Sequence, residues 1–501
     1  MSTNKEKGSA YNSRFGLLCV LIGGSVGTGN LWRFPRLVAE YGGGAFIVVM
    51  LVALMMIGIP LVYVENVAGR ATRHSAPGAF RDMIGPKYTW MGTFATAAYF
   101  MMNSYYMVVL AWCVRYTYMS ATKAYFGKDK AVLFDEVTNG DAGTFICWAA
   151  VLILLYLCIR KRAGLEKAAK FLMPSLLLIL LVLVVYSVTR NGAVDGLKYA
   201  FNFDPNALID SNVWLEAFTQ VVWSLGPGTM LIVAVSKYTA KDDDIALNTK
   251  IQAFGDMSFA LLGTICILPC IFAFASSSDE ALALCQSGNN GLTFIGLTNM
   301  FESMPGGAIV GTLFFLALSF AAFSTVITVT TCFSNVLIDV GVKRKKAVAI
   351  SVGAQAVVGI PSVLSQDFLS NQDTAWGFGL ILGTIFIGFL ARKFGTEKMR
   401  TKFINPVSDI KVGKSFNILA GTVAPLIILV VLVTWSIQSI GWDPQWWNPL
   451  KVSSLGTMLV QWAIVLAVSV GLNKTLNAKI KNKYFNGEEF GDIPEEVLNE
   501  Q

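Results

Sequence analysis

Apolar residues fill several long stretches of the chain almost without interruption. Residues 45–64 and 171–188 are two of these stretches, and each is long enough to cross the hydrocarbon core of a bilayer as a helix, which takes roughly 20 residues. The stretches do not alternate between apolar and polar positions, as the strands of a membrane β-barrel would. The pattern predicts an all-α polytopic membrane protein with twelve spans. These spans are 14–37, 42–66, 89–120, 143–159, 168–188, 213–238, 246–275, 306–340, 346–364, 374–391, 417–440 and 454–473.

Composition and charge favour the same class of protein. Of the 501 residues, 54% are hydrophobic and 14% are charged, whereas soluble proteins carry about 25% charged residues. With the N-terminus placed inside, thirty of the 39 Lys and Arg residues fall in inner segments, as the positive-inside rule requires. We therefore expect a multi-pass protein of the plasma or inner membrane with both termini cytoplasmic. The net charge of +7 then reflects topology, so nucleic-acid binding is not expected.

Other residues with distinctive chemistry argue against several kinds of site. The polar start of the chain leads directly into the first span, so no cleaved signal peptide is expected. The eight Cys residues form no CxxC pair and only Cys285 falls in an outer loop, so we expect neither disulfides nor a transition-metal site. The single histidine, His74, lies in a basic inner loop, where we expect a solvated side chain rather than a proton relay. No nucleophile–base set is visible in the loops, so an enzyme is not expected.

Two of the predicted spans are interrupted by glycine-rich sequence. The first breaks at GGSVGTGN, residues 23–30, and the sixth breaks at SLGPGTM, residues 224–230. Corresponding broken helices in two halves of a chain indicate an inverted repeat with a binding site between them. Because each half has five spans, an odd number, the second half must cross the membrane in the opposite orientation to the first. The predicted organisation is a cytoplasmic tail at 1–13, repeat halves at 14–200 and 201–392, spans eleven and twelve at 393–475, and a cytoplasmic tail at 476–501.

The first break offers backbone groups of both polarities. A half-helix that starts near Thr28 presents N–H donors and a positive dipole end, which suit a carboxylate. Three carbonyls of the preceding half suit a small hard cation, those of Gly23, Ser25 and Val26. The spacing of Gly23 and Gly27 is also that of a helix-packing motif, and this stretch alone would favour packing. Asn30 and Arg33 just downstream favour binding, because polar groups inside a span are costly and are usually functional.

Polar residues of other spans could complete the same site. Ser224 opens the second break, and Asp256 would be a buried carboxylate that is unstable without a cation. The hydroxyls of Ser324 and Thr325 could join it, although hydroxyls in spans often only bond back to their own helix. Tyr105 and Tyr106 could donate a phenolic hydroxyl to an anionic ligand, although either could instead be an interfacial or core aromatic residue. Two further residues could brace Arg33 or a break, Glu65 and Gln220.

The sequence of residues 14–46, RFGLLCVLIGGSVGTGNLWRFPRLVAEYGGGAF, strongly resembles the first span of the neurotransmitter:sodium symporters. The similarity continues through GLEKAAKFLMPSLLL, WSLGPG, KDDDIA, GLTFIGL and FAAFSTVI, and extends over residues 14–390. It implies a LeuT-type 5+5 inverted repeat of twelve transmembrane helices, with helices 1 and 6 unwound mid-membrane. It also implies sodium-driven uptake of an amino acid or related amine by alternating access, without an organic cofactor, in a monomer or weak homodimer.

The resemblance implies roles for four groups of residues. Sodium site one would use the substrate carboxylate together with Ser25, Asn30, Ser224 and Asp256. Sodium site two would use Gly23, Val26, Ala321, Ser324 and Thr325. The substrate would contact Gly27, Thr28, Gly29, Met102, Tyr106, Trp223, Gly226 and Thr229. The outer gate would consist of Arg33 and Asp373, and the inner gate would include Tyr238 and Asp339.

Three departures from the family pattern refine this expectation. Gly27 stands where the monoamine transporters carry an acidic residue, which predicts an amino acid as substrate. Asp256 and Ala260 stand where chloride-dependent members have Asn and Ser, so we expect chloride-independent transport, as in similar bacterial members. The usual N-terminal arginine of the inner gate has no clear match, so either Lys5 or Lys7 replaces it or the gate is weaker.

The predicted pocket contains no carboxylate that could pair with a basic side chain, because Asp256 would be engaged by sodium. We therefore expect a neutral substrate, an aliphatic or aromatic amino acid. Two other functions stay open on the same scaffold. A channel should show a symmetric pore-lining element in an oligomer, and a sensor would bind the amino acid without transporting it.

Overall fold

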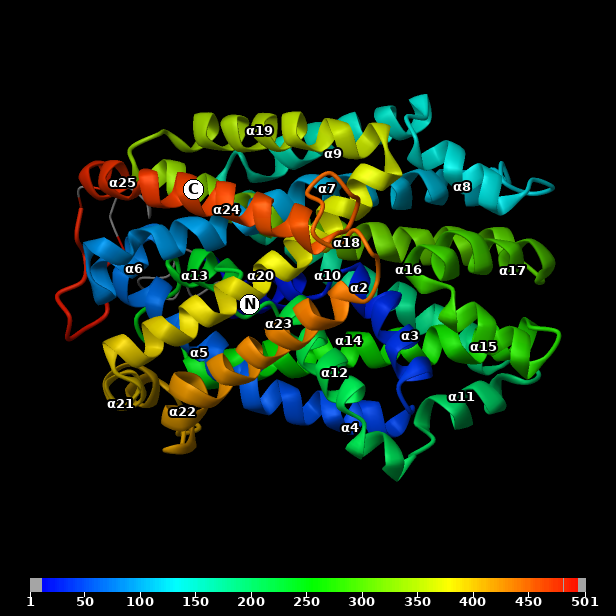
Figure 1. Ribbon diagram of the computed structural model, residues 1–501, viewed down its shortest axis with the longest axis horizontal. Coiled ribbons are helices and arrows are strands. Elements are labelled where there is room, and N and C mark those ends of the chain that lie inside the picture. Colours follow the sequence, from blue (N-terminus) through cyan, green and yellow to red (C-terminus); the bar gives the residue numbers. More distant parts are fainter. Residues whose placement is uncertain (1–10, 481, 494–501) are drawn as a thin grey trace.

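The computed structural model describes residues 11–480 and 482–493 of the chain. Within these ranges the chain is almost entirely helical, and its β-type pairing is one isolated bridge between Gly43 and Phe203. Figure 1 shows the long helices running along the longest axis, with short loop helices at both ends. Helices suit a bilayer because they satisfy their backbone hydrogen bonds internally.

Ten of the predicted spans are helices long and apolar enough to cross a membrane. Among the described residues, nine segments pass this test alone, and a tenth is a pair of helices bent by 43°. The nine are α4 with α5 (Gly44–Ala53 and Ile59–Thr72), α7 (Thr89–Ala121), α9 (Ala142–Ile159), α10 (Arg162–Val188), α14 (Ile245–Phe274), α18 (Gly307–Asp339), α19 (Arg344–Leu364), α20 (Gln366–Phe394) and α22 with α23 (Ser415–Ile418 and Ala424–Ile440). The bent pair is α24 (Leu455–Gly471) with α25 (Asn473–Lys479).

The other two spans, the first and the sixth, are broken into short helices. The first consists of α1 (Arg14–Ser25), α2 (Thr28–Leu31) and α3 (Arg33–Glu40). The sixth consists of α12 (Ser211–Ser224) and α13 (Leu231–Ser236). The prediction of twelve transmembrane helices, with the first and sixth unwound, is confirmed.

Short helices cover both ends of the bundle (Figure 1). At one end lie α6 (Ala76–Ile84) and α21 (Thr396–Lys398), together with the C-terminal part of the chain. At the other end lie α8 (Lys130–Thr138), α11 (Ala193–Phe201), α15 (Ser278–Gln286), α16 (Gly288–Asn290) and α17 (Leu297–Ser303). The connections at 121–142, 189–212 and 276–305 therefore contain short helices.

Two long helices, α7 and α18, form the centre of the bundle. They pack against each other, and α18 also contacts α1, α2 and α13. In the most apolar part of each, 72% of residues are buried inside the protein, against 28% for α9. Large apolar side chains such as Ile146, Ile153 and Leu178 are exposed on α9 and α10. Lipid is the natural neighbour of such faces, whereas the broken helices lie in the protein interior against α18.

The breaks follow from the local sequence. In the sixth span Gly226 and Gly228 have φ values of 72° and 89°, a region that glycine enters without a steric penalty. A Cβ at Gly228 would also lie 2.2 Å from the backbone nitrogen of Thr384, so α20 approaches too closely for any side chain. In the first span Val26 and Gly27 are extended, which ends α1 and starts α2 in a new direction.

Candidate functional site

A buried carboxylate lies between the two breaks. Asn30 Nδ2 on α2 donates to Asp256 Oδ1 at 2.8 Å, and Ser224 Oγ at the end of α12 donates to Asp256 Oδ2 at 2.7 Å. All three residues are buried. Among the described residues, Asp256 forms no ion pair, and its hydrogen-bond donors are these two neutral side chains. A buried carboxylate with only neutral donors is costly to keep ionised, and a bound cation would supply the missing counter-charge.

Ser25, the fourth residue predicted for sodium site one, contacts this group indirectly. Its hydroxyl donates to Leu21 O at 3.4 Å and accepts from Gln252 Nε2 at 2.7 Å. Gln252 lies one turn before Asp256 on α14, so it ties the end of α1 to the helix that carries the carboxylate. The role predicted for Ser25 uses its backbone carbonyl, which leaves the hydroxyl available for this contact.

Four oxygen atoms gather at the end of α1 on the side of α18. Ser324 Oγ donates to Ala321 O at 2.8 Å and lies 3.5 Å from Val26 O. Thr325 Oγ1 lies 3.3 Å from each of the same two carbonyls. These four residues belong to the set predicted for sodium site two, and the fifth, Gly23, precedes Val26 by about one helical turn. Hard oxygen donors of this kind suit an alkali or alkaline-earth cation.

Tyr106 meets the start of the second half-helix. Its hydroxyl accepts a hydrogen bond from Thr28 N at 3.0 Å and lies 3.0 Å from Thr28 Oγ1. A Cβ at Gly27 would lie 3.1 Å from the same hydroxyl and 3.4 Å from Thr325 Oγ1, and a Cβ at Gly29 would meet nothing within 4 Å. Backbone donors, a phenolic hydroxyl and unfilled space therefore meet at one point, as the carboxylate end of a small ligand requires.

The other residues predicted for the pocket belong to the second break and to α7. Thr229 Oγ1 donates to Gly226 O at 2.6 Å, so the hydroxyl of this residue is engaged with the break itself. Trp223 packs on α20 so closely that a Cβ at Gly377 would lie 2.2 Å from Trp223 Cζ2. Met102 is buried on α7, one helical turn before Tyr106. The lack of a side chain at Gly377 thus leaves the space that the Trp223 indole ring occupies.

The two residues predicted for the outer gate have different partners. Arg33 Nη2 pairs with Glu216 Oε2 at 2.9 Å, and Arg33 Nη1 donates to Gln220 Oε1. Asp373 Oδ1 accepts from Tyr105 Oη at 2.8 Å. No hydrogen bond or ion pair joins Arg33 to Asp373 within the described ranges. The expected support of Arg33 by Gln220 is present, and Glu216, one turn earlier on α12, is a partner that the sequence analysis missed although it is an acidic residue in a predicted span.

Glu65 braces the second break. Its carboxylate is fully buried, with Oε1 accepting from Gly228 N at 2.5 Å and Oε2 accepting from Ile232 N at 3.1 Å. From the other side, Thr384 Oγ1 donates to Pro227 O at 2.7 Å. Backbone groups that an intact helix would satisfy are thus satisfied by side chains of α5 and α20, which is how a broken helix is tolerated at membrane depth.

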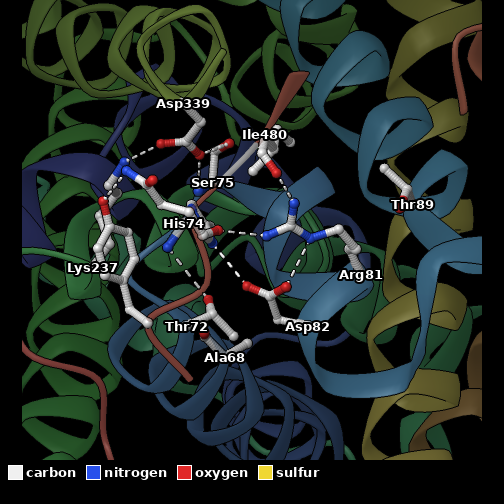
Figure 2. Close-up of polar contacts among 12 residues, drawn as sticks. Ala68, Thr72, His74, Ser75, Arg81, Asp82, Thr89, Lys237, Asp339 and Ile480 are labelled. Atoms are coloured by element: carbon white, nitrogen blue, oxygen red, sulfur yellow. Dashed lines mark hydrogen bonds and ion pairs between the residues drawn. The ribbon is translucent and has the colours of Figure 1, made fainter. Parts of the chain in front are cut away.

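The residues predicted for the inner gate lie together at the end of α13. Tyr238 Oη donates to Asn335 Oδ1 at 2.8 Å and accepts from Arg344 Nη2 at 3.1 Å. Asp339 Oδ1 lies 2.9 Å from Lys237 Nζ, and Figure 2 shows this pair. Lys237 was not singled out from the sequence, because an isolated lysine at the inner end of a span is explained equally well by the positive-inside rule.

The structure corrects the expectation of a solvated histidine. His74 is 3% exposed, and its Nδ1 lies 2.8 Å from Asp82 Oδ2, which is itself buried (Figure 2). The Tyr484 ring covers it, with ring centres 5.2 Å apart. The tertiary fold buries the loop because the C-terminal segment crosses it, which the local sequence does not reveal. Lys5 and Lys7, expected near the inner gate, lie outside the described residues.

Comparisons with known proteins find relatives over most of the chain. The sequence model of the sodium:neurotransmitter symporter family matches residues 8–131 and 125–478. An uncharacterized sodium-dependent transporter of Methanocaldococcus jannaschii is 30% identical over 444 residues, which are 84% of this chain and 89% of that protein. The sodium-dependent neutral amino acid transporter B(0)AT2 of Rattus norvegicus is 25% identical over 336 residues, which are 57% of this chain and 46% of that protein.

A solved structure shares the fold. The crystal structure of MhsT in complex with L-phenylalanine superposes with a TM-score of 0.73 at 28% identity, covering 85% of this chain and 99% of that one. The matched family residues extend over nearly all of the twelve-helix bundle. From its sequence, its two broken helices and these similarities, the chain belongs to the sodium:neurotransmitter symporter family, a family of multi-pass, sodium-dependent membrane transporters.

Proposed function

We propose that this chain takes up a neutral amino acid together with sodium by alternating access. The observation that carries the proposal is the environment of Asp256, a buried carboxylate with neutral donors and no ion-pair partner among the described residues. A sodium ion bound there, with Asn30, Ser224 and the backbone carbonyl of Ser25, would satisfy the charge. A second ion would bind at the oxygen cluster around Val26 and Ser324, which gives two sodium sites.

An amino acid is the substrate class that fits the first break. Its carboxylate would take the N–H groups at Thr28 and Gly29 and the Tyr106 hydroxyl, and would complete the coordination of the first sodium ion. For this, Tyr106 Oη must turn from Thr28 N, which it contacts at 3.0 Å, toward the ligand. Gly27 leaves room for the carboxylate. MhsT binds L-phenylalanine, and B(0)AT2 is named for neutral amino acids, which is consistent with this class.

The proposed side-chain pocket favours an uncharged substrate. Its members are Met102, Trp223, Gly226 and Thr229, none of which carries a charge. A basic side chain would need a carboxylate partner, because an unpaired charge in a desolvated pocket is costly. The absence of side-chain bulk at Gly226, together with the large indole of Trp223, suits an aliphatic or aromatic group.

We also propose that transport does not require chloride. In a chloride-dependent symporter the anion offsets the charge of the bound sodium. Here Asp256 supplies a fixed negative charge at the sodium cluster, and Ala260, one turn further along α14, has no hydroxyl with which to bind an anion. From the sequence we further propose that the repeat halves are residues 14–200 and 201–392 and that both termini are cytoplasmic. We propose that the chain is a monomer or weak homodimer in the membrane.

The test is uptake of radiolabelled amino acids into proteoliposomes that contain the purified chain. A panel of neutral amino acids, L-phenylalanine among them, is offered with an inward sodium gradient, with an equal potassium gradient, and with gluconate in place of chloride. Saturable uptake that needs sodium and persists in gluconate is expected. Binding without uptake would identify a sensor, and sodium flux that does not saturate with amino acid would identify a channel. Either outcome would refute the symporter.

A further inference from the structure

A buried ion pair closes the inner end of the bundle. Lys237 follows the last residue of α13 directly, and its Nζ lies 2.9 Å from Asp339 Oδ1 at the end of α18. Both side chains are only 5% exposed. Figure 2 shows the two groups pointing toward each other from these two elements. An ion pair this far from water holds its partners in one geometry, since either charge alone would be left without solvation.

Among the described residues, both oxygens of the Asp339 carboxylate have hydrogen-bond donors. Oδ2 accepts from the backbone nitrogen of Ser75 at 2.6 Å and from Ser75 Oγ at 2.5 Å, while Oδ1 receives the lysine (Figure 2). Within the part of the chain that the structure describes, Lys237 is the cation in ion-pair contact with Asp339. The nearby imidazole of His74 is turned to Asp82 instead.

The end of α13 is attached at a second point by the neighbouring residue. Tyr238 Oη bonds to Asn335 Oδ1 on α18 at 2.8 Å, so two consecutive residues of the sixth span hold the same long helix. The backbone carbonyl of Lys237 accepts from Arg73 Nη1 at 3.0 Å, which fixes the start of the lysine side chain. By contrast the N-terminal end of α13 is the unwound break, where Met230 has a φ of 63°.

These contacts place the charge of Lys237 at the end of α13, the helix that would move when the inner end of the bundle opens. Because α13 is short and begins at an unwound segment, it can rotate as a unit about that break, as hinged elements do. Rotation of α13 away from α18 would separate Lys237 from Asp339 and admit water to both. Hydration of the separated charges would offset the free energy lost with the ion pair, so the open conformation would not be prohibitively costly.

Resting on the symporter function proposed above, we propose that Lys237 is the cation of the inner gate. It closes the pathway from within the transport core, in place of a cation of the N-terminal tail. Opening to the inside is then coupled directly to movement of α13, because that movement itself breaks the ion pair. A gate cation in the tail would instead have to be released by a separate event.

Cys332 offers a native reporter of inner opening. It lies on α18 two turns before Asp339, is 4% exposed, and has its Sγ 4.0 Å from Met230 O in the second break. A variant that keeps only this cysteine is reconstituted in inside-out vesicles and treated with a membrane-impermeant methanethiosulfonate in sodium. Labelling rates are compared for Lys237→Gln, Lys237→Arg, Asp339→Asn and the double variant Lys237→Gln with Asp339→Asn. The apparent KM for uptake is measured in parallel.

The expected result is at least fivefold faster labelling in Lys237→Gln and in Asp339→Asn, with no further gain in the double variant, since coupled residues are not additive. Lys237→Arg keeps the charge and should label slowly. Lys241→Gln removes an exposed lysine of the next loop, paired with Asp492, and should match the parent. The apparent KM of Lys237→Gln should rise, because fewer molecules then face outward.

Three results would overturn the assignment. Lys237→Gln could label at the parent rate, its effect could add fully to that of Asp339→Asn, or Lys5→Gln with Lys7→Gln could reproduce the faster labelling while Lys237→Gln does not. Failure of the symporter proposal would be distinguished by the parent chain, which would then show no sodium-dependent uptake in any assay. Circular dichroism and size-exclusion profiles of each variant show whether it is folded. If Lys237→Gln is not folded, the double variant is compared with Asp339→Asn, and a further gain in labelling would overturn the assignment.

Discussion

Gly27 provides the sharpest test of the substrate class. Its φ and ψ of −117° and −170° are extended, so any residue can adopt this backbone without strain. A substitution therefore reports on the space beside it and on the charge placed there. A Cβ would lie 3.1 Å from Tyr106 Oη and 3.4 Å from Thr325 Oγ1. These contacts are tight but can relax by a few tenths of an ångström, so Gly27→Asn should weaken amino-acid binding by about tenfold or less, about 1 kcal/mol.

Gly27→Asp has nearly the same volume but adds a negative charge where the substrate carboxylate is proposed to bind. Two carboxylates about 4 Å apart repel by about 4 kcal/mol at an effective dielectric constant of about 20. This corresponds to a loss of affinity of about a thousandfold. A decarboxylated amine would not suffer this repulsion. The ratio of amino-acid to amine affinity should therefore fall sharply in Gly27→Asp and stay near the parent value in Gly27→Asn.

The assay is equilibrium binding of labelled amino acid to the purified protein in sodium, with competition by the matching amine. L-Phenylalanine and phenethylamine form one such pair. If Gly27→Asp and Gly27→Asn weaken amino-acid binding equally, the effect is steric and the carboxylate does not bind beside residue 27. If Gly27→Asp binds amino acid as tightly as the parent, the whole placement of the ligand at the first break is wrong.

Asp256→Asn should raise the sodium concentration for half-maximal uptake at least tenfold, because the counter-charge of the ion is lost; an unchanged sodium titration would contradict the proposed site. Gly377→Ala should cost about 1–3 kcal/mol through overpacking against the Trp223 indole, and Trp223→Phe in the same chain should restore much of the loss in thermal unfolding and in uptake. Truncation after Lys479 removes the carbonyl of Gly491 that accepts from Arg73 Nε at 2.7 Å, so thermal stability should fall by about 2 kcal/mol; a truncated chain as stable as the parent would show that the C-terminal segment does not stabilise the inner face.

The spans and the breaks could be predicted because each depends on local sequence. A run such as 171–188 is apolar over a bilayer's thickness whatever its neighbours are, and it forms part of α10. The glycine-rich segments 23–30 and 224–230 contain residues that interrupt a helix, and both interrupt one. Asp256 was recognisable as a candidate ligand because an unpaired carboxylate inside a span is rarely structural.

Partners that are far apart in the sequence could not be predicted in the same way. Glu216 pairs with Arg33 only because α12 and the first break lie side by side, and no local pattern states that contact. His74 is buried by Tyr484, a residue more than four hundred positions away. A basic loop is normally solvated, so the sequence favoured the wrong environment until the position of the C-terminal segment was known.

Two of the buried carboxylates, Glu65 and Asp256, have contrasting partners at the two broken spans. Each lies on the helix that follows a broken span, and each reaches the break of the opposite half: Glu65 binds the sixth span, and Asp256 binds Asn30 in the first. The Glu65 carboxylate accepts from two backbone N–H groups, Gly228 N and Ile232 N, donors that a bound cation cannot replace.

Asp256 accepts instead from the side chains of Asn30 and Ser224, which can rotate to present their own oxygens to an ion. The helix that follows a broken span therefore carries a carboxylate that braces backbone groups in one half and, in the proposed function, a carboxylate that binds sodium in the other. This difference is the reason that the proposed function places sodium at Asp256 and not at Glu65. Glu65→Gln should accordingly lower thermal stability at every sodium concentration. Asp256→Asn should instead reduce the stabilisation that sodium gives, a contrast that one thermal titration of both variants can measure.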